Sequence, residues 1–159
     1  MPGEIKSHEA YIALGSNLGD REANLRNALK NLEDEGIEIL AVSSFISSEP
    51  YGVTDQPKFL NAVCKVRTIL EPLELLRTLL AIESKMGRVR LRHWGERNID
   101  LDLLFYEDEV ISTDELKLPH PDLQNRSFVL TPLNEIAADL VHPTLGKTTA
   151  ELLNMLNAA

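Results

Sequence analysis

The chain has 159 residues, of which 43% are hydrophobic and 26% are charged, a composition typical of one globular domain with its own core. Its formal net charge of −9 argues against broad electrostatic binding to nucleic acid or to an anionic membrane. No apolar run approaches the roughly 20 residues that span a bilayer, and the first ten residues lack the apolar core of a signal peptide. We therefore expect a cytoplasmic protein whose residues 1–159 form a single domain, with a flexible tail at 1–8.

Hydrophobic periodicity and turn residues divide the first two thirds of the chain into alternating elements. In chain order we predict a strand at 9–17, a helix at 20–35, a strand at 37–46, a long loop at 47–58, a strand at 59–70, a helix at 72–86, an arginine-rich loop at 87–97 and a strand at 98–106. Asp20 is placed to cap the first helix and Pro72 to begin the second, while Gly36 and Gly87 end them.

The remaining third predicts a tight turn with a short strand near Val110, an extended turn around Pro119 and Pro121, and a helix beginning near Gln124. A last amphipathic helix at 148–159 would be capped by Thr148 or the following threonine, Thr149. The order strand, helix, strand, strand, helix, strand predicts an α+β fold. We expect a ferredoxin-like βαββαβ core with helices packed on one face of a largely antiparallel sheet, as an α/β sandwich.

The densest charge pattern lies in residues 87–106, GRVRLRHWGERNIDLDLLFY. Four of the nine arginines fall between 88 and 97, where Glu96 is the only acid. Guanidinium groups match the oxygens of a phosphate, so we predict a local anion site, with a solvated basic loop as the alternative. Trp94 in this loop is either a lid over a ligand or a surface residue.

Asp100 and Asp102 lie in the strand that follows this loop. Alternate residues of a strand share a face, so the two carboxylates point one way while Ile99, Leu101 and Leu103 point the other. Their Cα atoms should lie about 6.6 Å apart, a spacing at which carboxylates can hold two divalent ions. All-oxygen ligands favour Mg²⁺. Beside the arginines, the pair predicts a site for a metal-bound polyphosphate; two solvated acids are the alternative.

Other polar and aromatic residues lie outside this stretch. His120, fixed between two prolines, and Arg126 form a second polar group, although a histidine in a turn can be purely structural. Four more residues could hold a planar heterocycle, two amides at its edge and two aromatic rings on its face: Asn17, Asn61, Phe59 and Phe128. For the two phenylalanines, packing in the core is the alternative.

Several familiar site patterns are absent from the sequence. It contains no GxxxxGK[ST] or GxGxxG nucleotide loop, no GxSxG elbow and no zinc-binding spacing of cysteine and histidine. The single Cys64 excludes an internal disulfide and lies in an apolar stretch, where we expect a core residue; a reactive thiol is the alternative.

Six phrases occur in one order along the chain: YIALGSNLGD, SSFISSEPYG, DQPKFLNAV, ESKMGRVR, RHWGERNIDLDLL and LPHPDLQNRSFVLTPLNEIA. Together they resemble the 6-hydroxymethyl-7,8-dihydropterin pyrophosphokinase family of the folate pathway, over about residues 11–142. The last two phrases form a highly specific pair. The resemblance implies a ferredoxin-like α/β sandwich, and we expect the stand-alone enzyme and not a fusion with another folate enzyme.

The resemblance also implies an activity and a set of site residues. The family transfers pyrophosphate from ATP to the hydroxymethyl group of the pterin, giving AMP and the pterin pyrophosphate, with two Mg²⁺ held by the D-x-D carboxylates. The catalytic residues then correspond to Arg88, Arg92, Arg97, Asp100 and Asp102. The pterin contacts correspond to Asn17, Phe59, Asn61, Glu83, Trp94 and Phe128. The ATP contacts correspond to Gln56, Arg88, Arg97, Ile99, His120 and Arg126.

Some points stay open at this stage. Glu49 and Tyr51 depart from the family pattern in the pterin loop, and either Arg90 or Arg92 supplies the contact from the arginine-rich loop. The loops at 47–58 and 87–97 are predicted to close over the ligands.

The partners expected are ATP and the pterin, with no nucleic acid or membrane, and a monomer is favoured. Two alternative interpretations are an RNA-binding ferredoxin-like module and a regulatory small-molecule sensor that catalyses no reaction.

Overall fold

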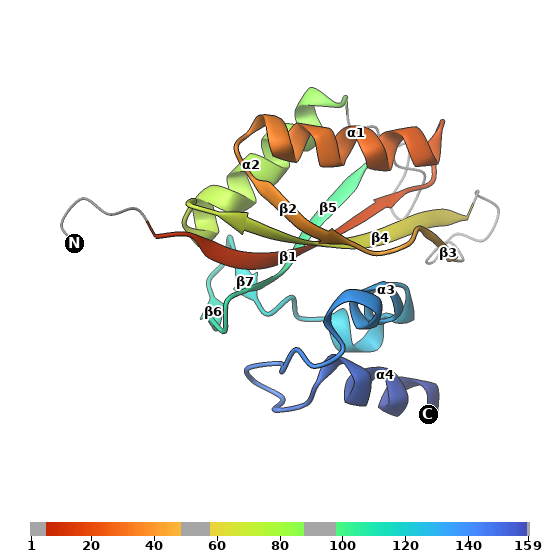
Figure 1. Ribbon diagram of the computed structural model, residues 1–159, viewed down its shortest axis with the longest axis vertical. Coiled ribbons are helices and arrows are strands. Elements are labelled where there is room, and N and C mark those ends of the chain that lie inside the picture. The colour runs from red at the N-terminus through yellow and green to blue at the C-terminus, as the bar shows by residue number, and fades with distance from the viewer. Residues whose placement is uncertain (1–5, 49–57, 88–97, 159) are drawn as a thin grey trace.

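The computed structural model describes residues 6–48, 58–87 and 98–158 (Figure 1). In chain order, the strands and helices in these ranges are β1 (His8–Ser16), α1 (Arg21–Asp34), β2 (Glu38–Val42), β3 (Ile46–Ser48), β4 (Phe59–Thr68), α2 (Pro72–Lys85), β5 (Asp100–Tyr106), β6 (Ile111–Ser112), β7 (Lys117–Leu118), α3 (Ser127–Ala137) and α4 (Thr149–Ala158). Within the described ranges, no helix combines the length and the apolar character that crossing a membrane requires.

The main sheet has the strand order β2-β4-β1-β5, with β3 paired to β4, and every pair is antiparallel. The first and third long strands of the chain, β1 and β4, therefore lie in the centre, and β5 forms one edge. This order confirms the predicted ferredoxin-like core. Strands β6 and β7 form a separate two-stranded hairpin.

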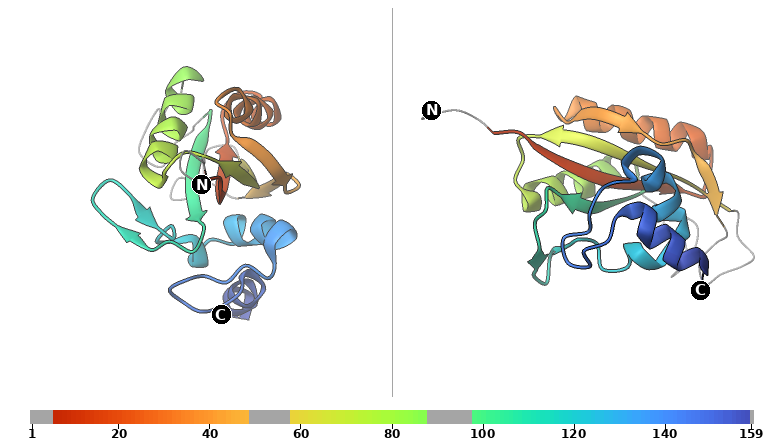
Figure 2. Two further views of the ribbon diagram at one scale, coloured as in Figure 1. Left: turned by 60° about the vertical axis from the view of Figure 1, so that its left-hand side comes forward. Right: turned by 60° about the horizontal axis from the view of Figure 1, so that its bottom comes forward.

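Helices cover both faces of this sheet (Figures 1 and 2). Helices α1 and α2 pack on one face, where Ile12 and Leu14 of β1 belong to the larger apolar cluster. Helices α3 and α4 pack on the other face, where Tyr11 of β1 and Val63 of β4 belong to the second cluster. The expectation of helices on one face was wrong for the C-terminal pair, because β1 and β4 carry apolar residues on both faces.

The helix ends follow the predicted capping residues closely. The Asp20 side chain accepts a hydrogen bond from the backbone N–H of Ala23 at 3.1 Å, and Gly36, with φ of +80°, follows the end of α1. In front of α4, the N–H of Glu151 donates to Thr148 Oγ1 at 3.1 Å and the Glu151 carboxylate accepts from Thr148 N at 2.9 Å. This reciprocal capping box identifies Thr148 as the cap. Helix α3 begins at Ser127, after a short 3₁₀ helix at Leu123–Asn125.

The predicted strand at 37–46 is interrupted between β2 and β3, which is a second correction. Ser43 Oγ accepts from the backbone N–H of Val63 at 2.9 Å, in place of a regular ladder bond. The next residue, Ser44, donates its N–H and its hydroxyl to the Glu135 carboxylate of α3 at 2.8 and 2.7 Å. The chain therefore leaves the sheet at these two serines and returns to β4 as β3.

Cys64 lies in β4 and is completely buried, as expected for a core residue. Burial raises the pKa of its thiol to about 12. A thiol with this pKa is protonated at neutral pH and is not a nucleophile.

Candidate functional site

Three neighbouring strands align the candidate residues in rows across the sheet. Gly15 of β1 lies opposite Asn61 of β4 on one side and opposite Asp100 of β5 on the other. One row along, Ala13 lies opposite Val63 and Asp102. Directly opposed residues of antiparallel strands share a face, so Asn61 and both aspartates project from the face that carries α3 and α4.

The two aspartates are half-buried, and the apolar residues around them point the other way. Ile99, Leu101 and Leu103 belong to the cluster under α1 and α2. This confirms the predicted alternation along β5. In the part of the chain that the structure describes, no three carboxylate, histidine or cysteine groups gather closely enough to enclose a metal. The pair fits Mg²⁺, which takes one or two protein carboxylates and completes its shell with water and phosphate oxygens.

The backbone between the two aspartates is fixed by Glu83 of α2. This side chain is 5% exposed, and its Oε2 accepts a hydrogen bond from the N–H of Leu101 at 2.7 Å. Because β5 is an edge strand, this N–H points away from β1 and needs a partner outside the ladder. Sequence resemblance gave Glu83 only as a pterin contact, and its bond to β5 was missed.

Asn61 is oriented by the neighbouring strand β3. Its Nδ2 donates to Ser48 Oγ at 2.6 Å and lies 3.4 Å from the carbonyl of Ile46, so both amide hydrogens have acceptors. The Oδ1 atom is left on the side of Gly15. Asn17, which is 1% exposed, lies just beyond the end of β1. The structure thus brings Asn17, Phe59 and Asn61 to the same end of the sheet as Asp100.

His120 enters the site through an irregularity in β5. Leu104 has no partner in β1, because the register shifts between its neighbours, and its carbonyl accepts from the backbone N–H of His120 at 2.9 Å. The Nδ1 atom of His120 accepts from the N–H of Asp122 at 3.2 Å. A neutral imidazole that accepts at Nδ1 carries its proton on Nε2, so this ring offers an N–H donor.

Charges around His120 act on its ring in opposite directions. Burial lowers the pKa of His120 and Arg126 lowers it further, while Asp122 and Asp100 raise it, with a net shift downward. The Arg126 guanidinium carbon lies 5.8 Å from the centre of the Phe128 ring, and its Nη2 lies 3.7 Å from the Asp122 carboxylate. His120 and Asp100 are therefore close enough to interact electrostatically.

Five predicted site residues lie outside the described residues: Gln56, Arg88, Arg92, Trp94 and Arg97. The ends of the arginine-rich loop are described. Asn98 Nδ2 donates to the carbonyls of Met86 at 2.9 Å and Gly87 at 3.2 Å, so the loop leaves α2 and enters β5 at neighbouring points. Gly87 and Asn98, the described residues on either side of 88–97, therefore lie next to each other. Asn98 was not singled out from the sequence, since its partners are backbone atoms.

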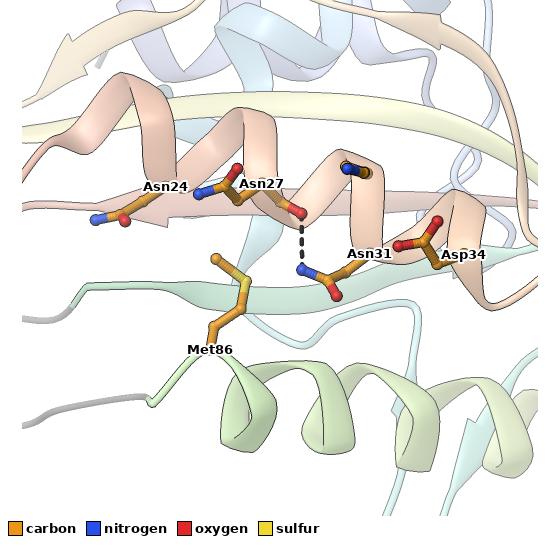
Figure 3. A pocket seen from close by; sticks show the side chains of 6 residues that line it. Asn24, Asn27, Asn31, Asp34 and Met86 are labelled. Atoms are coloured by element: carbon orange, nitrogen blue, oxygen red, sulfur yellow. Dashed lines mark hydrogen bonds between the residues drawn. The ribbon is translucent and has the colours of Figure 1, made fainter.

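A hollow lies between α1 and α2, on the side of the sheet opposite to the two aspartates (Figure 3). It has a volume of about 310 Å³ and a mostly polar lining: Asn24, Asn27, Lys30, Asn31, Asp34 and Met86. Asn31 Nδ2 donates to the Asn27 carbonyl at 2.9 Å, and Asn24 Nδ2 donates to the Leu18 carbonyl at 2.9 Å. The amides thus bond within the chain, and this groove lacks the carboxylate pair found on β5.

Known proteins are similar to this chain in sequence. The family model described as 7,8-dihydro-6-hydroxymethylpterin-pyrophosphokinase (HPPK) matches residues 11–138. A 2-amino-4-hydroxy-6-hydroxymethyldihydropteridine pyrophosphokinase of Haemophilus influenzae is 51% identical over 135 residues, covering 84% of each chain. The enzyme of the same name from Methylorubrum extorquens is 46% identical over 149 residues, covering 93% of each chain.

A solved structure is similar in fold. The Plasmodium falciparum HPPK-DHPS crystal structure superposes on 98% of this chain and 43% of that chain, with a TM-score of 0.76 and 17% sequence identity. That likeness supports the fold assignment alone. The family model and the two bacterial relatives, which match most of the sequence, establish that this chain belongs to the 7,8-dihydro-6-hydroxymethylpterin-pyrophosphokinase family.

Proposed function

We propose that this protein transfers the pyrophosphoryl group of ATP to the hydroxymethyl oxygen of 6-hydroxymethyl-7,8-dihydropterin, a step of folate biosynthesis. The products are AMP and the pterin pyrophosphate. The observation that carries the proposal is the alignment of Asn61, Gly15 and Asp100 across three strands in a chain of this family. In this row, an amide that can bond to a heterocycle and a carboxylate that can hold a metal-bound phosphate lie on either side of a glycine.

Asp100 and Asp102 would hold two Mg²⁺ ions through their carboxylate oxygens. When bound, the metal supplies positive charge that stabilises the transferred phosphoryl oxygens. Glu83 would keep the two carboxylates in place, because it fixes the backbone of Leu101 between them. The precision of this spacing matters, since phosphoryl transfer depends mainly on positioning and on neutralising charge.

The nucleotide would lie against His120 and Arg126. The neutral His120 ring donates from Nε2 to a nucleotide oxygen, and its lowered pKa keeps it in this form at neutral pH. The Arg126 guanidinium, half-buried above the Phe128 ring, supplies a planar donor for a phosphate oxygen. Arg88, Arg92 and Arg97 are proposed to complete the phosphate contacts, with Gln56 contacting the nucleotide; Ile99, whose side chain is buried in the cluster under α1 and α2, would contact it through its backbone.

The pterin would lie at the Asn61 end of the row formed by Asn61, Gly15 and Asp100. Asn17 and Asn61 would bond to the ring edge, Phe59 and Phe128 would contact its faces, and Trp94 would cover it. Glu83 lies at the β5 end of this row, where its bond to Leu101 connects it to the two carboxylates instead of the pterin. In the reaction, the hydroxymethyl oxygen attacks the β-phosphorus in line, the bond from that phosphorus to the bridging oxygen of the α-phosphate breaks, AMP leaves with this oxygen, and the hydroxyl proton is released to solvent. The described residues near the acceptor position include no evident strong base.

The test is product formation by the purified chain. With ATP, Mg²⁺ and the pterin, we expect AMP and the pterin pyrophosphate in equal amounts, and no AMP when either the pterin or Mg²⁺ is omitted. Release of AMP without the pterin would identify a hydrolase instead. Binding of both ligands without AMP would identify a sensor. A cytoplasmic location and a monomeric state stay predictions from the sequence.

A further inference from the structure

Gly15 occupies a position in β1 where the backbone does not require glycine. The described glycines with positive φ are Gly19, Gly36, Gly87 and Gly146, and Gly15 is not among them. Its backbone is that of an ordinary paired strand, with Asn61 on one side and Asp100 on the other. Glycine inside a strand is unfavourable relative to alanine, because the unfolded chain gains freedom and a side chain is lost from packing.

Packing against the described residues does not require glycine either. A Cβ atom built on Gly15 would lie 3.4 Å from Asn61 Oδ1 and 3.7 Å from Phe59 Cδ1, which are ordinary contact distances. No other described atom is within 4 Å of it. An alanine would therefore fit into the protein without displacing a neighbour. The missing side chain leaves a space above the central strand.

The groups around Gly15 favour a ligand with one kind of ring edge. Both hydrogens of the Asn61 amide have acceptors in Ser48 Oγ and the Ile46 carbonyl, so the amide presents its oxygen. An oxygen acceptor favours a ring edge that carries N–H groups, and Phe59 Cδ1 lies close to the same position above Gly15. Asp100 bounds the row on the far side of Gly15.

We propose that Gly15 is a specificity-determining residue, whose missing side chain admits the N–H edge of a flat heterocycle between Asn61 Oδ1 and Phe59. This inference rests on the proposed function, in which that heterocycle is the pterin. The Ile46 carbonyl fixes which end of the Asn61 amide meets the ring, because it can only accept, and Ser48 is a positioning residue, because its hydroxyl holds the Nδ2 end at 2.6 Å. A side chain at position 15 would occupy the space that the ring edge uses.

The experiment is a binding series with Gly15→Ala and Gly15→Val, measured by titration of 6-hydroxymethyl-7,8-dihydropterin in the presence of Mg²⁺ and a non-hydrolysable ATP analogue. For Gly15→Ala we expect the pterin dissociation constant to rise at least about tenfold, and further for valine. The dissociation constant of the ATP analogue, measured alone, should change less than about twofold. The Tm of Gly15→Ala should equal or exceed that of the parent, because nothing in the strand requires glycine.

Unchanged pterin affinity in Gly15→Ala would overturn the inference. A lower Tm with unchanged affinity would show instead that glycine serves strand packing. Ser48→Ala provides a second variant that leaves β1 untouched: it should weaken the pterin and leave the ATP analogue unaffected, and Ser48→Thr should restore binding through its hydroxyl. If Ser48→Ala binds the pterin like the parent, the orienting role is wrong.

This series separates the inference from the proposed function. The titrations measure affinity without turnover, so a parent chain that binds the pterin but forms no AMP would contradict the function and leave the role of Gly15 to be decided by the variants. A parent chain that forms AMP while Gly15→Ala binds the pterin normally would contradict the inference alone. A parent chain that binds no pterin would contradict both.

Discussion

Two histidines of this chain precede a proline and build similar turns in different surroundings. In the first, His120 Nδ1 accepts from the N–H of Asp122 at 3.2 Å. In the second, His142 Nδ1 accepts from the N–H groups of Thr144 at 3.2 Å and Leu145 at 3.1 Å. An accepting Nδ1 must be unprotonated, so both turns place the ring proton on Nε2. Burial lowers the pKa of both histidines.

The surroundings of the two rings separate their roles. His120 also interacts with the charges of Arg126, Asp122 and Asp100, which connects it to β5, the strand that carries the two aspartates. His142 is 5% exposed and packs edge-on against the Phe105 ring, with ring centres 5.7 Å apart. The local sequence therefore sets which ring nitrogen of each histidine carries the proton, while the tertiary contacts decide whether the ring lies among charged groups or in the core.

The largest expected effect comes from removing the carboxylate that interacts with His120. Asp100→Asn should lower the rate of AMP formation by more than about a hundredfold, because it removes a metal ligand and not merely a residue that supports one. The same variant should lower the pKa of His120 further, measured by NMR titration, and leave that of His142 unchanged. Asp102→Asn should lower the rate of AMP formation by a similar factor. Turnover close to that of the parent in either variant would contradict the metal site.

Alanine at each histidine should separate activity from stability. His120→Ala is expected to raise the KM for ATP about tenfold, as loss of a hydrogen bond to a charged oxygen does, with little change in Tm. His142→Ala is expected to lower the free energy of unfolding by about 1–3 kcal/mol, because two backbone N–H groups lose their acceptor, with KM unchanged. Steady-state kinetics and denaturant unfolding on both variants measure this. Equal effects from the two substitutions would remove the distinction between the turns.

The pH dependence of stability should be carried partly by His142. Its pKa is lower in the folded protein than in the unfolded chain, so the unfolded chain binds more protons, and stability present above pH 6.5 is lost as the pH falls below it. His142→Asn keeps an acceptor at the position of Nδ1 but does not titrate. We expect its stability to depend less on pH between about 7 and 5 than that of the parent. An unchanged slope in urea unfolding would assign the pH dependence elsewhere.

The smallest expected effect is electrostatic. Arg126→Gln removes the positive charge that lowers the pKa of His120, so this pKa should rise, while the pKa of His142 should not move. Two-dimensional NMR of the histidine ring signals against pH follows both residues in one sample. A shift at both residues would indicate a change of fold and not a local charge effect.

The sequence predicted well those features that depend on neighbours within a few residues. Asp20 marks the start of α1 by its own side chain, and the alternation from Ile99 to Leu103 faces the two aspartates away from the α1 and α2 layer. The break after β2 could not be predicted in this way, because Ser44 is held by Glu135, which lies 91 residues further on. The second helical layer was missed for another reason: β1 and β4 carry apolar residues on both faces, so α3 and α4 cover the second one.

In the candidate site, too, the sequence predicted what depends on near neighbours and not what depends on distant strands. Asp100 and Asp102 are recognisable from their spacing, but the register that puts Asn61, Gly15 and Asp100 in one row is a property of three strands that are distant in sequence. Gly15 lies inside the strand predicted at 9–17 and pairs as part of it, but it was not singled out as a site residue. A glycine inside an alternating strand is a signal of close approach by another group, and this signal could have identified it.

The hydrogen bond from Leu101 to Glu83 also affects how the molecule behaves among its copies. A sheet edge offers unpaired N–H groups to any extended segment that approaches, and such edges allow strand addition and aggregation. On β5 the outward N–H of Leu101 is already bonded to a buried carboxylate of the same chain, at 2.7 Å. An added strand would have to displace that carboxylate and leave it without its donor in a buried position, so α2 also protects the β5 edge against self-association.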